Sequence, residues 1–276
     1  MGILVILGFL ILWIIYMAAV RTTVEGRPFR FGLVGQAKTV DPALVENHVE
    51  KILASTMYES LVWWDDQTQS LKPCLASNWG YSKDSKSIIF MIKTDVTFHN
   101  GRRMQALDVK RSWERSLKAL GSPATTSLFA TVVGAKEFIK GTTQEITGIK
   151  VVDRHTIQVN LTQPDSAFVY KVTHPAFWVV DTKDRIEIPP GTGPFKLGAF
   201  QPDNNLTVKG YRYYHGLRPA LSQIQFTCYK DENQGLAAFR AGNLDALDSV
   251  PRSEVAGLLE AKSGECLIKS PLMGFY

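Results

Sequence analysis

Pro189-Pro190-Gly191-Thr192-Gly193-Pro194 is the strongest break in the chain, because three prolines and two glycines fall within six residues. Such a run ends regular secondary structure and favours a rigid turn. It does not match a phosphate-binding loop, since the G-x-x-x-x-G-K-S/T spacing is missing and Pro194 lacks the amide that would donate to a phosphate. We therefore predict a rigid crossing between two structural units at residues 189–194.

Periodic apolar patterns lie on both sides of this crossing. Phe29, Phe31 and Leu33 alternate as in a strand, and Asp41-Pro42 is typical of a helix N-terminus with Asp as the cap. We predict strands at 29–33, 87–92, 195–200, 206–211, 223–229 and 267–276, a hairpin at 149–152 and 156–161, and helices at 41–57, 106–120, 233–241 and 251–261. Strands and helices mix without strict alternation, which favours an α/β or α+β fold with two lobes.

The composition is that of a folded globular protein. Of the 276 residues 45% are hydrophobic and 21% charged, which excludes a disordered or collagen-like chain. The formal net charge is +5, and its cations are densest at Arg102, Arg103, Lys110, Arg111, Arg115 and Lys118. This cluster either steers an anionic partner or forms the solvated face of one helix, and we favour the second interpretation. No nucleic-acid partner is predicted.

Residues 1–20 are apolar apart from two glycines and carry no charge. This apolar run is long enough to cross a bilayer. We expect a signal peptide or an uncleaved signal anchor, with membrane contact through residues 3–20. The anchor is favoured because Tyr16-Met17-Ala18 is a poor cleavage site, and no cysteine follows for lipid attachment. Arg21, Arg27 and Arg30 follow the run, and positive-inside counting alone would keep the body in the cytoplasm.

Few residues suggest catalysis or metal binding. Cys74, Cys228 and Cys266 form no C-x-x-C pair, and one disulfide with a free thiol or three buried thiols are both compatible with their spacing. The five histidines show no zinc-binding spacing, so neither a metal nor a cofactor is predicted. No G-x-S-x-G motif marks a nucleophilic serine. We expect His99 to be satisfied by turn backbone rather than to act as a ligand or base.

Adjacent aromatic residues are a second kind of candidate. Neighbours on a strand face opposite sides, so in Trp63-Trp64 and in Phe177-Trp178 one ring can line a cleft while the other packs in a core. A position of both rings in the core stays open for each pair.

A series of short motifs runs through the chain in a fixed order. It comprises Val40-Asp41-Pro42, Tyr58-Glu59-Ser60-Leu61-Val62, Pro73-Cys74-Leu75-Ala76-Ser77-Asn78-Trp79, Asp95-Val96-Thr97-Phe98-His99-Asn100-Gly101, Ala106-Leu107-Asp108-Val109, Gly191-Thr192-Gly193-Pro194 and Gly242-Asn243-Leu244-Asp245. Together these motifs resemble family 5 of the extracellular solute-binding proteins, the peptide- and nickel-type binding components of ABC importers. Asn100 and Ser60 depart mildly from the family pattern, which usually has Asp and Gly there.

The resemblance implies a fold as well as a class. The expected fold is mixed α/β (α+β), periplasmic-binding-protein-like, two-lobed and of type II, with ligand enclosed by hinge closure. A discontinuous first lobe would occupy residues 21–61 and 188–268, with an inserted subdomain at 62–187. Family members are roughly twice as long, so residues 269–276 would begin a second lobe that is largely missing.

The function implied is noncovalent capture of an oligopeptide or similar small solute for ABC permease subunits, without catalysis. The chain would be a truncated form or would work with a separately encoded second lobe. It would lie in the periplasm or elsewhere outside the cytoplasm, secreted or anchored to the cytoplasmic membrane. We predict that the ligand pairs by strand addition with Val34, Gly35, Gln36 and Ala37. Tyr58 and Trp178 are predicted as apolar walls of the cleft.

Two other classes of function stay open. A membrane-tethered interaction module would bind a partner, and no solute, through the face that the missing lobe leaves uncovered. A hydrolase whose triad is assembled in space would be labelled by a serine-directed probe. The residues do not distinguish a peptide, a nickel chelate and a sugar as the solute.

Overall fold

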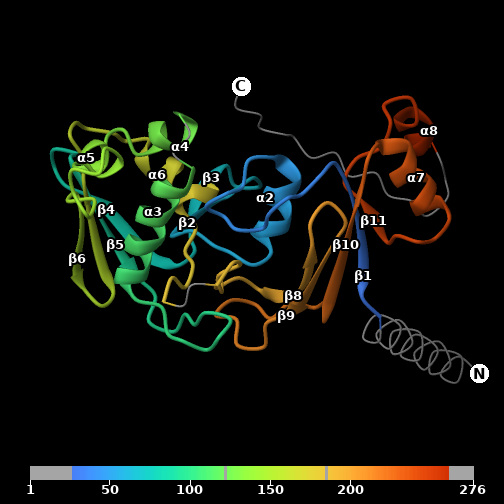
Figure 1. Cartoon of the computed structure of the whole chain (residues 1–276), viewed down its shortest axis with the longest axis horizontal. Coiled ribbons are helices and arrows are strands. Elements are labelled where there is room, and N and C mark those ends of the chain that lie inside the picture. The colour runs from blue at the N-terminus through green and yellow to red at the C-terminus, as the bar shows by residue number, and fades with distance from the viewer. Residues whose placement is uncertain (1–26, 121–122, 184–185, 261–276) are drawn as a thin grey trace, which may run out of the picture.

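The computed structural model describes residues 27–120, 123–183 and 186–260, and shows two bodies that lie side by side (Figure 1). We call residues 62–179 the inserted body. The described residues before and after it, 27–61 and 180–260, form the main body. The chain crosses between the bodies near residue 61 and again after residue 179, and residues 189–194 belong to this second crossing.

The main body is built on a five-stranded sheet in the order β11-β1-β10-β9-β8. Its strands are β1 (Phe29–Val34), β8 (Phe195–Gln201), β9 (Asn205–Gly210), β10 (Gln223–Tyr229) and β11 (Ala246–Leu247). β1 runs parallel to β10 and β11, whereas the β10–β9 and β9–β8 pairs are antiparallel. The four longer strands confirm the predictions made from alternation, while two-residue β11 is too short to show a period.

Three helices belong to the main body: α2 (His48–Ser55), α7 (Glu232–Arg240) and α8 (Val255–Glu260). α7 confirms the predicted helix, and Gly242 follows it with a φ of +73°, a left-handed conformation that favours glycine. α8 lies within the helix predicted at 251–261 but begins later, at Val255.

The predicted helix start at Asp41 is wrong. α2 is capped by Asn47, whose side chain accepts from the Glu50 amide while the Glu50 carboxylate accepts from the Asn47 amide. Asp41 is buried, accepts from the Ala43 amide at 3.0 Å and pairs with Arg115 of the inserted body. A tertiary ion pair therefore occupies the carboxylate that was expected to cap the helix.

The inserted body holds a four-stranded antiparallel sheet, in the order β4-β5-β7-β6, and a separate two-stranded ribbon. The sheet strands are β4 (Ala76–Tyr81), β5 (Ser87–Ile92), β6 (Ile149–Asp153) and β7 (Thr156–Asn160), and the ribbon is β2 (Val62–Asp65) with β3 (Ser70–Pro73). β5 and the β6–β7 hairpin confirm the predictions there. The helices are α3 (Ala106–Leu120), α4 (Pro123–Leu128), α5 (Ala135–Ile139) and α6 (Phe168–Lys171), with a 3-10 turn η1 (Pro175–Phe177).

α3 covers one face of this sheet (Figure 1) and confirms the predicted helix with the same bounds. Val109, Trp113 and Leu117 recur every four residues and are buried, as the periodicity predicts. The Trp113 indole donates to the Phe177 carbonyl oxygen at 2.8 Å, and the two rings meet edge to face at 5.0 Å. This bond satisfies the one polar atom of a fully buried side chain.

Each body has its own core. One cluster of buried apolar side chains lies in the inserted body and includes the adjoining Leu61. The other joins β1, α2, β9 and β10 of the main body and includes Trp178, at the end of the inserted body. The domain boundaries at 61/62 and 187/188 stay a prediction, and two separate cores are what such boundaries require.

No helix among the described residues is long and apolar enough to cross a membrane. The apolar run at 1–20, the strand predicted at 267–276 and Cys266 lie outside the described residues.

Candidate functional site

The crossing at residues 189–194 is held by the imidazole of His99. The Gly191 amide donates to His99 Nδ1 at 3.3 Å, and His99 Nε2 lies 3.0 Å from the Gly193 carbonyl oxygen. Since an amide only donates, Nδ1 is the acceptor and Nε2 carries the proton. Burial lowers the pKa of His99 to about 4, which keeps the ring neutral at pH 7. Backbone therefore satisfies His99, as predicted, but it is the backbone of the crossing.

The two glycines of the crossing bring two backbones into contact. A Cβ at Gly191 would lie 2.0 Å from the Met57 carbonyl oxygen, and one at Gly193 would lie 2.7 Å from the Met57 carbonyl carbon. The Gly193 amide donates to that same oxygen at 2.9 Å. The absence of side chains thus allows the crossing to pack directly on the chain that follows α2.

A buried carboxylate, Glu59, lies beside the crossing and gathers donors from distant parts of the chain. Its side chain is 9% exposed and accepts from the Tyr214 hydroxyl at 2.7 Å and the Thr192 hydroxyl at 2.9 Å. His215 Nε2 lies 2.9 Å from it and Cys74 Sγ 3.5 Å. Burial, together with the Glu59 charge, raises the pKa of Tyr214 and of Cys74, so both remain protonated donors.

Glu59, His215 and Thr192 are residue types found in hydrolytic triads, but their arrangement is different. The Thr192 hydroxyl donates to the carboxylate rather than to the histidine, and Thr192 is fully buried. A nucleophile must bond to its general base and reach the substrate. The cluster therefore fixes the loop after β9 to the crossing and lacks the geometry of a catalytic site.

Arg102 joins two buried aspartates, one from each body. Its guanidinium contacts Asp181 through Nε and Nη2, both at 2.7 Å, and Asp108 through Nη1 at 3.1 Å and Nη2 at 2.8 Å. The Asp181 side chain is only 1% exposed. Burial pushes the pKa of Asp181 upward, but the Arg102 guanidinium and the Asn100 amide outweigh it and hold that pKa below its usual value. These two bidentate ion pairs fix the orientation of the segment that leads into the crossing relative to α3.

Most of the predicted cationic cluster is paired. The pairs are Arg102 with Asp108 and Asp181, Arg115 with Asp41, Lys110 with Glu114 and Glu145, and Lys118 over the Phe138 ring. Arg103 and Arg111 have no carboxylate partner within the described ranges. This face is largely neutralised, which agrees with a solvated helix surface better than with a docking site for an anion.

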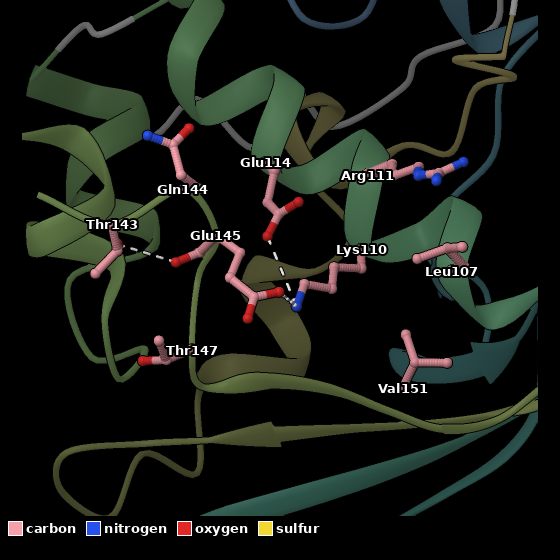
Figure 2. Close-up of a pocket in the computed structure, with 9 residues that line it drawn as sticks. All are labelled: Leu107, Lys110, Arg111, Glu114, Thr143, Gln144, Glu145, Thr147 and Val151. Atoms are coloured by element: carbon pink, nitrogen blue, oxygen red, sulfur yellow. Dashed lines mark hydrogen bonds and ion pairs between the residues drawn. The ribbon is translucent and has the colours of Figure 1, made fainter. Parts of the chain in front are cut away.

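An open groove of about 850 Å³ lies between α3 and the loop that precedes β6 (Figure 2). Lys110 stands at its centre, 2.5 Å from Glu145 and 3.9 Å from Glu114. Burial raises the pKa of Glu114, whereas the hydrogen bond from Lys110 lowers the pKa of exposed Glu145. The central cation is thus already paired with carboxylates, and the groove has no unpaired charge at its centre to hold a ligand.

The predicted binding segment, Val34 to Ala37, directly follows β1. Gly35 has a φ of +133°, which favours glycine, and its amide donates to the Tyr229 carbonyl oxygen at 2.8 Å. The Val34 amide donates to Asp248 Oδ1 at 3.0 Å. Gln36 is exposed, and its backbone groups have no hydrogen-bond partner in the described part of the chain. Unpaired backbone therefore lies at the carboxyl end of a strand inside the sheet.

The two predicted apolar walls lie in the core of the main body. Tyr58 is 2% exposed, and its hydroxyl donates to the Pro189 carbonyl oxygen at 2.8 Å. It lines a hollow of about 210 Å³ beside the crossing. Trp178 is 7% exposed, and its indole donates to the Thr173 carbonyl oxygen at 3.2 Å. Ala37 of the predicted segment belongs to the same buried cluster as both rings, and their role in a cleft stays a prediction.

The remaining candidates are the paired aromatic residues, the cysteines and a metal site. Trp63 is 48% exposed, whereas Phe177 is fully buried and stacks on Phe129 at 4.3 Å. Cys74 and Cys228 are free thiols in the described structure. Among the described residues no cluster of three His, Cys, Asp or Glu side chains could hold a metal ion.

The fold is that of the periplasmic binding proteins. The Escherichia coli murein tripeptide binding protein MppA matches with a TM-score of 0.73 and 23% identity over 87% of this chain and 50% of its own. A nickel ABC transporter structure from Bacillus halodurans matches with a TM-score of 0.72 and 23% identity over 86% of this chain and 46% of its own. Both alignments cover only about half of the larger protein.

The sequence gives the family directly. Residues 70–275 match the model of the bacterial extracellular solute-binding proteins, family 5, and the chain belongs to this family. It is 24% identical over 257 residues to the probable deoxycholate-binding periplasmic protein YgiS of E. coli, and 27% identical over 186 residues to the dipeptide-binding protein DppE of Bacillus subtilis. These alignments cover 87% and 63% of this chain, but 47% and 34% of the relatives. The relatives are binding proteins rather than enzymes, and the chain spans about half their length or less.

Proposed function

We propose that this chain supplies the first lobe of the solute-binding component of an ABC importer, which captures an oligopeptide or similar small solute noncovalently. The observation that carries the proposal is the free backbone at the end of β1. In open α/β sheets, ligands bind outside the carboxyl ends of the strands. Gln36 lies at that place, exposed and without a backbone partner among the described residues.

Residues 35–37 are held in a conformation that suits strand addition. Gly35 points its amide inward to Tyr229, and Asp203 donates its amide to the Ala37 carbonyl oxygen at 2.8 Å. The backbone on both sides of Gln36 is therefore pinned, which presents Gln36 in a fixed conformation. An extended peptide can pair with such preformed backbone without first ordering it.

The proposed first lobe comprises residues 21–61 and 188–268, with 62–187 as an inserted subdomain. A second lobe, encoded separately or further along the same protein, would complete the cleft and permit closure. Arg115 ties this subdomain to the first lobe through Asp41. Arg102 holds Asp181, whose amide donates to the Pro190 carbonyl oxygen of the crossing. The two bodies would then move as one unit during closure.

The test changes the backbone amides of the peptide ligand and leaves the protein unchanged. Gly35→Pro is unsuitable, because it would remove the bond to Tyr229 and demand a negative φ. Di- to tetrapeptides are titrated by calorimetry into the chain, alone and with a separately produced second lobe, and each is compared with analogues N-methylated at single amides. Methylation at alternate amides should weaken binding about tenfold, the effect of one lost main-chain bond of about 1.4 kcal/mol.

The control is Gln36→Ala, which removes a side chain and leaves the backbone in place. This variant should bind within a factor of about three of the parent, since surface truncations cost little. If all methylated analogues bind like the parent peptide, strand addition at this segment is wrong. If a nickel chelate or a sugar binds and peptides do not, the solute class is wrong.

We also propose that the body lies outside the cytoplasm, tethered through residues 3–20. Support comes from the extracellular family and from a run long enough to span a bilayer. Protease added to intact spheroplasts should digest the body while a cytoplasmic marker survives. Protection of the body until lysis would place it in the cytoplasm.

A further inference from the structure

The loop at residues 211–222, between β9 and β10, exposes an apolar tip flanked by cations. Leu217 is 95% exposed, more than any other large apolar side chain described, and Tyr213 is 67% exposed. Arg212 and Arg218 are exposed as well, with the Arg212 guanidinium 5.5 Å from the centre of the Tyr213 ring. Within the described ranges neither arginine pairs with a carboxylate. Two cations without a carboxylate partner in the described part of the chain thus flank two exposed side chains with large apolar surfaces.

The base of this loop is held rigidly. Tyr214 and His215 turn inward onto Glu59, at 2.7 Å and 2.9 Å. The Tyr211 amide donates to the Pro194 carbonyl oxygen at 2.7 Å, and its hydroxyl donates to the Phe98 carbonyl oxygen at 2.8 Å. A buried carboxylate must be fully hydrogen-bonded, and the donors that bond to Glu59 fix the loop in place. A loop held in this way presents its exposed side chains in one arrangement.

The loop lies at the same end of the sheet as the start of β1. β1 and β10 are parallel with Phe29 opposite Ile224, and β9 ends at Gly210, so the end of the β9–β10 connection that enters β10 lies beside residue 29. Figure 1 shows this connection and the beginning of β1 at the lower edge of the main body. The uncharged apolar run ends at residue 20. Nine residues reach at most about 30 Å, so a bilayer that holds this run lies within about 30 Å of the start of β1.

We propose that this loop docks the body on an anionic phospholipid surface. Leu217 would enter the boundary between headgroups and acyl chains, and Tyr213 would lie at headgroup level, as amphipathic rings do. Arg212 and Arg218 would contact lipid phosphates. β1 places Val34–Ala37 at the opposite end of the sheet, about 20 Å away for six residues of strand. The docked body therefore turns its proposed solute segment away from the membrane.

The test measures the depth of position 217 with the full chain in nanodiscs. Leu217→Trp is compared with Val152→Trp, a matched control on β6 of the inserted body where the native side chain is 57% exposed. Quenching by brominated acyl chains is recorded in phosphatidylcholine alone and with phosphatidylglycerol. The six native tryptophans contribute equally to both variants, so the difference between them reports the new ring. Unchanged unfolding midpoints confirm that both variants fold.

We expect added quenching for Leu217→Trp in phosphatidylglycerol discs, suppressed by high salt, and none for Val152→Trp. Adding Arg212→Gln and Arg218→Gln should lower the ratio of docked to undocked protein about thirty-fold, from about five-fold for each cation near an anionic surface. Absence of added quenching at position 217 in anionic discs would overturn the proposal. So would equal quenching in neutral and anionic discs, or quenching that depends on protein concentration, which would indicate contact with a second copy.

Discussion

Gly191→Ala tests whether the close backbone approach at the crossing holds the two bodies together. The new Cβ would lie 2.0 Å from the Met57 carbonyl oxygen, over 1 Å inside ordinary contact, and the obstacle is backbone rather than a flexible side chain. The φ of Gly191 is not in the left-handed region, so alanine brings no dihedral strain there. Steric exclusion alone should therefore account for the effect.

The magnitude follows from the bonds that relief of this clash would break. Moving residue 191 by about 1 Å stretches two hydrogen bonds to His99. One runs from the Gly191 amide to His99 Nδ1, now 3.3 Å, and the other from the His99 amide to the Gly191 carbonyl oxygen, now 2.9 Å. It also loosens the 2.9 Å bond from the Gly193 amide to Met57. Three bonds at about 1 kcal/mol each, with about 1 kcal/mol of residual overpacking, predict a loss of roughly 4 kcal/mol.

Urea unfolding followed by far-ultraviolet circular dichroism and tryptophan fluorescence measures this loss. The matched control is Gly80→Ala on β4, where a Cβ would meet nothing within 4 Å, and it should lie within about 0.5 kcal/mol of the parent. Because the variant weakens the junction more than either core, the two probes should separate in Gly191→Ala and coincide in Gly80→Ala. Equal stability of the two variants would refute the argument from close approach.

Three further predictions concern the polar groups around the crossing. The pKa of His99 is about 4 when folded and about 6.5 when unfolded, so its contribution is complete above pH 6.5 and is lost as the pH falls towards 4. His99→Gln should remove roughly 2–3 kcal/mol of the stability difference between pH 6.5 and 4, and an unchanged slope in urea unfolding across this range would contradict the assignment. Arg102→Leu leaves two buried aspartates unpaired and should cost about 3–5 kcal/mol, with partial recovery in Arg102→Lys; a loss below 1 kcal/mol would show that water reaches the site. Tyr214→Phe removes a bond to the Glu59 carboxylate and should cost about 1.5–3 kcal/mol, whereas exposed Tyr213→Phe should be neutral. Differential scanning calorimetry compares the last two, and equal midpoints would mean that the buried bond contributes nothing.

Local patterns predict most of the longer elements that bury one face. α3 was predicted with its observed bounds, because Val109, Trp113 and Leu117 keep a strict helical period along one solvated helix. β4 was missed, since only Ala76 of its six residues is fully buried and the strand shows no alternation. α4 and α6 are too short to complete two turns, so no period can be read from them.

The polar core could not be predicted in the same way. Glu59, Thr192 and Tyr214 are far apart in sequence, and each alone is an ordinary polar residue. They meet only in the folded chain, where Thr192 of the crossing and Tyr214 of the loop after β9 both bond to Glu59. The same reason explains the error at Asp41, whose partner Arg115 lies in the other body. Local rules assign such residues to caps or solvent because long-range ion pairs carry no sequence period.

A fully bonded buried carboxylate is difficult to explain by stability alone, since an apolar residue of similar size usually does as well. What Glu59 adds is specificity of position. Thr192 belongs to the crossing and Tyr214 to the loop after β9, so one carboxylate sets both segments at once. An apolar replacement such as Glu59→Leu would preserve packing but permit the loop to shift relative to the crossing. The proposed docking on lipid gives a reason to keep a buried carboxylate at this position. The loop must present its side chains to a flat membrane surface in one orientation, and docking depends on that orientation more than on the stability of the main body.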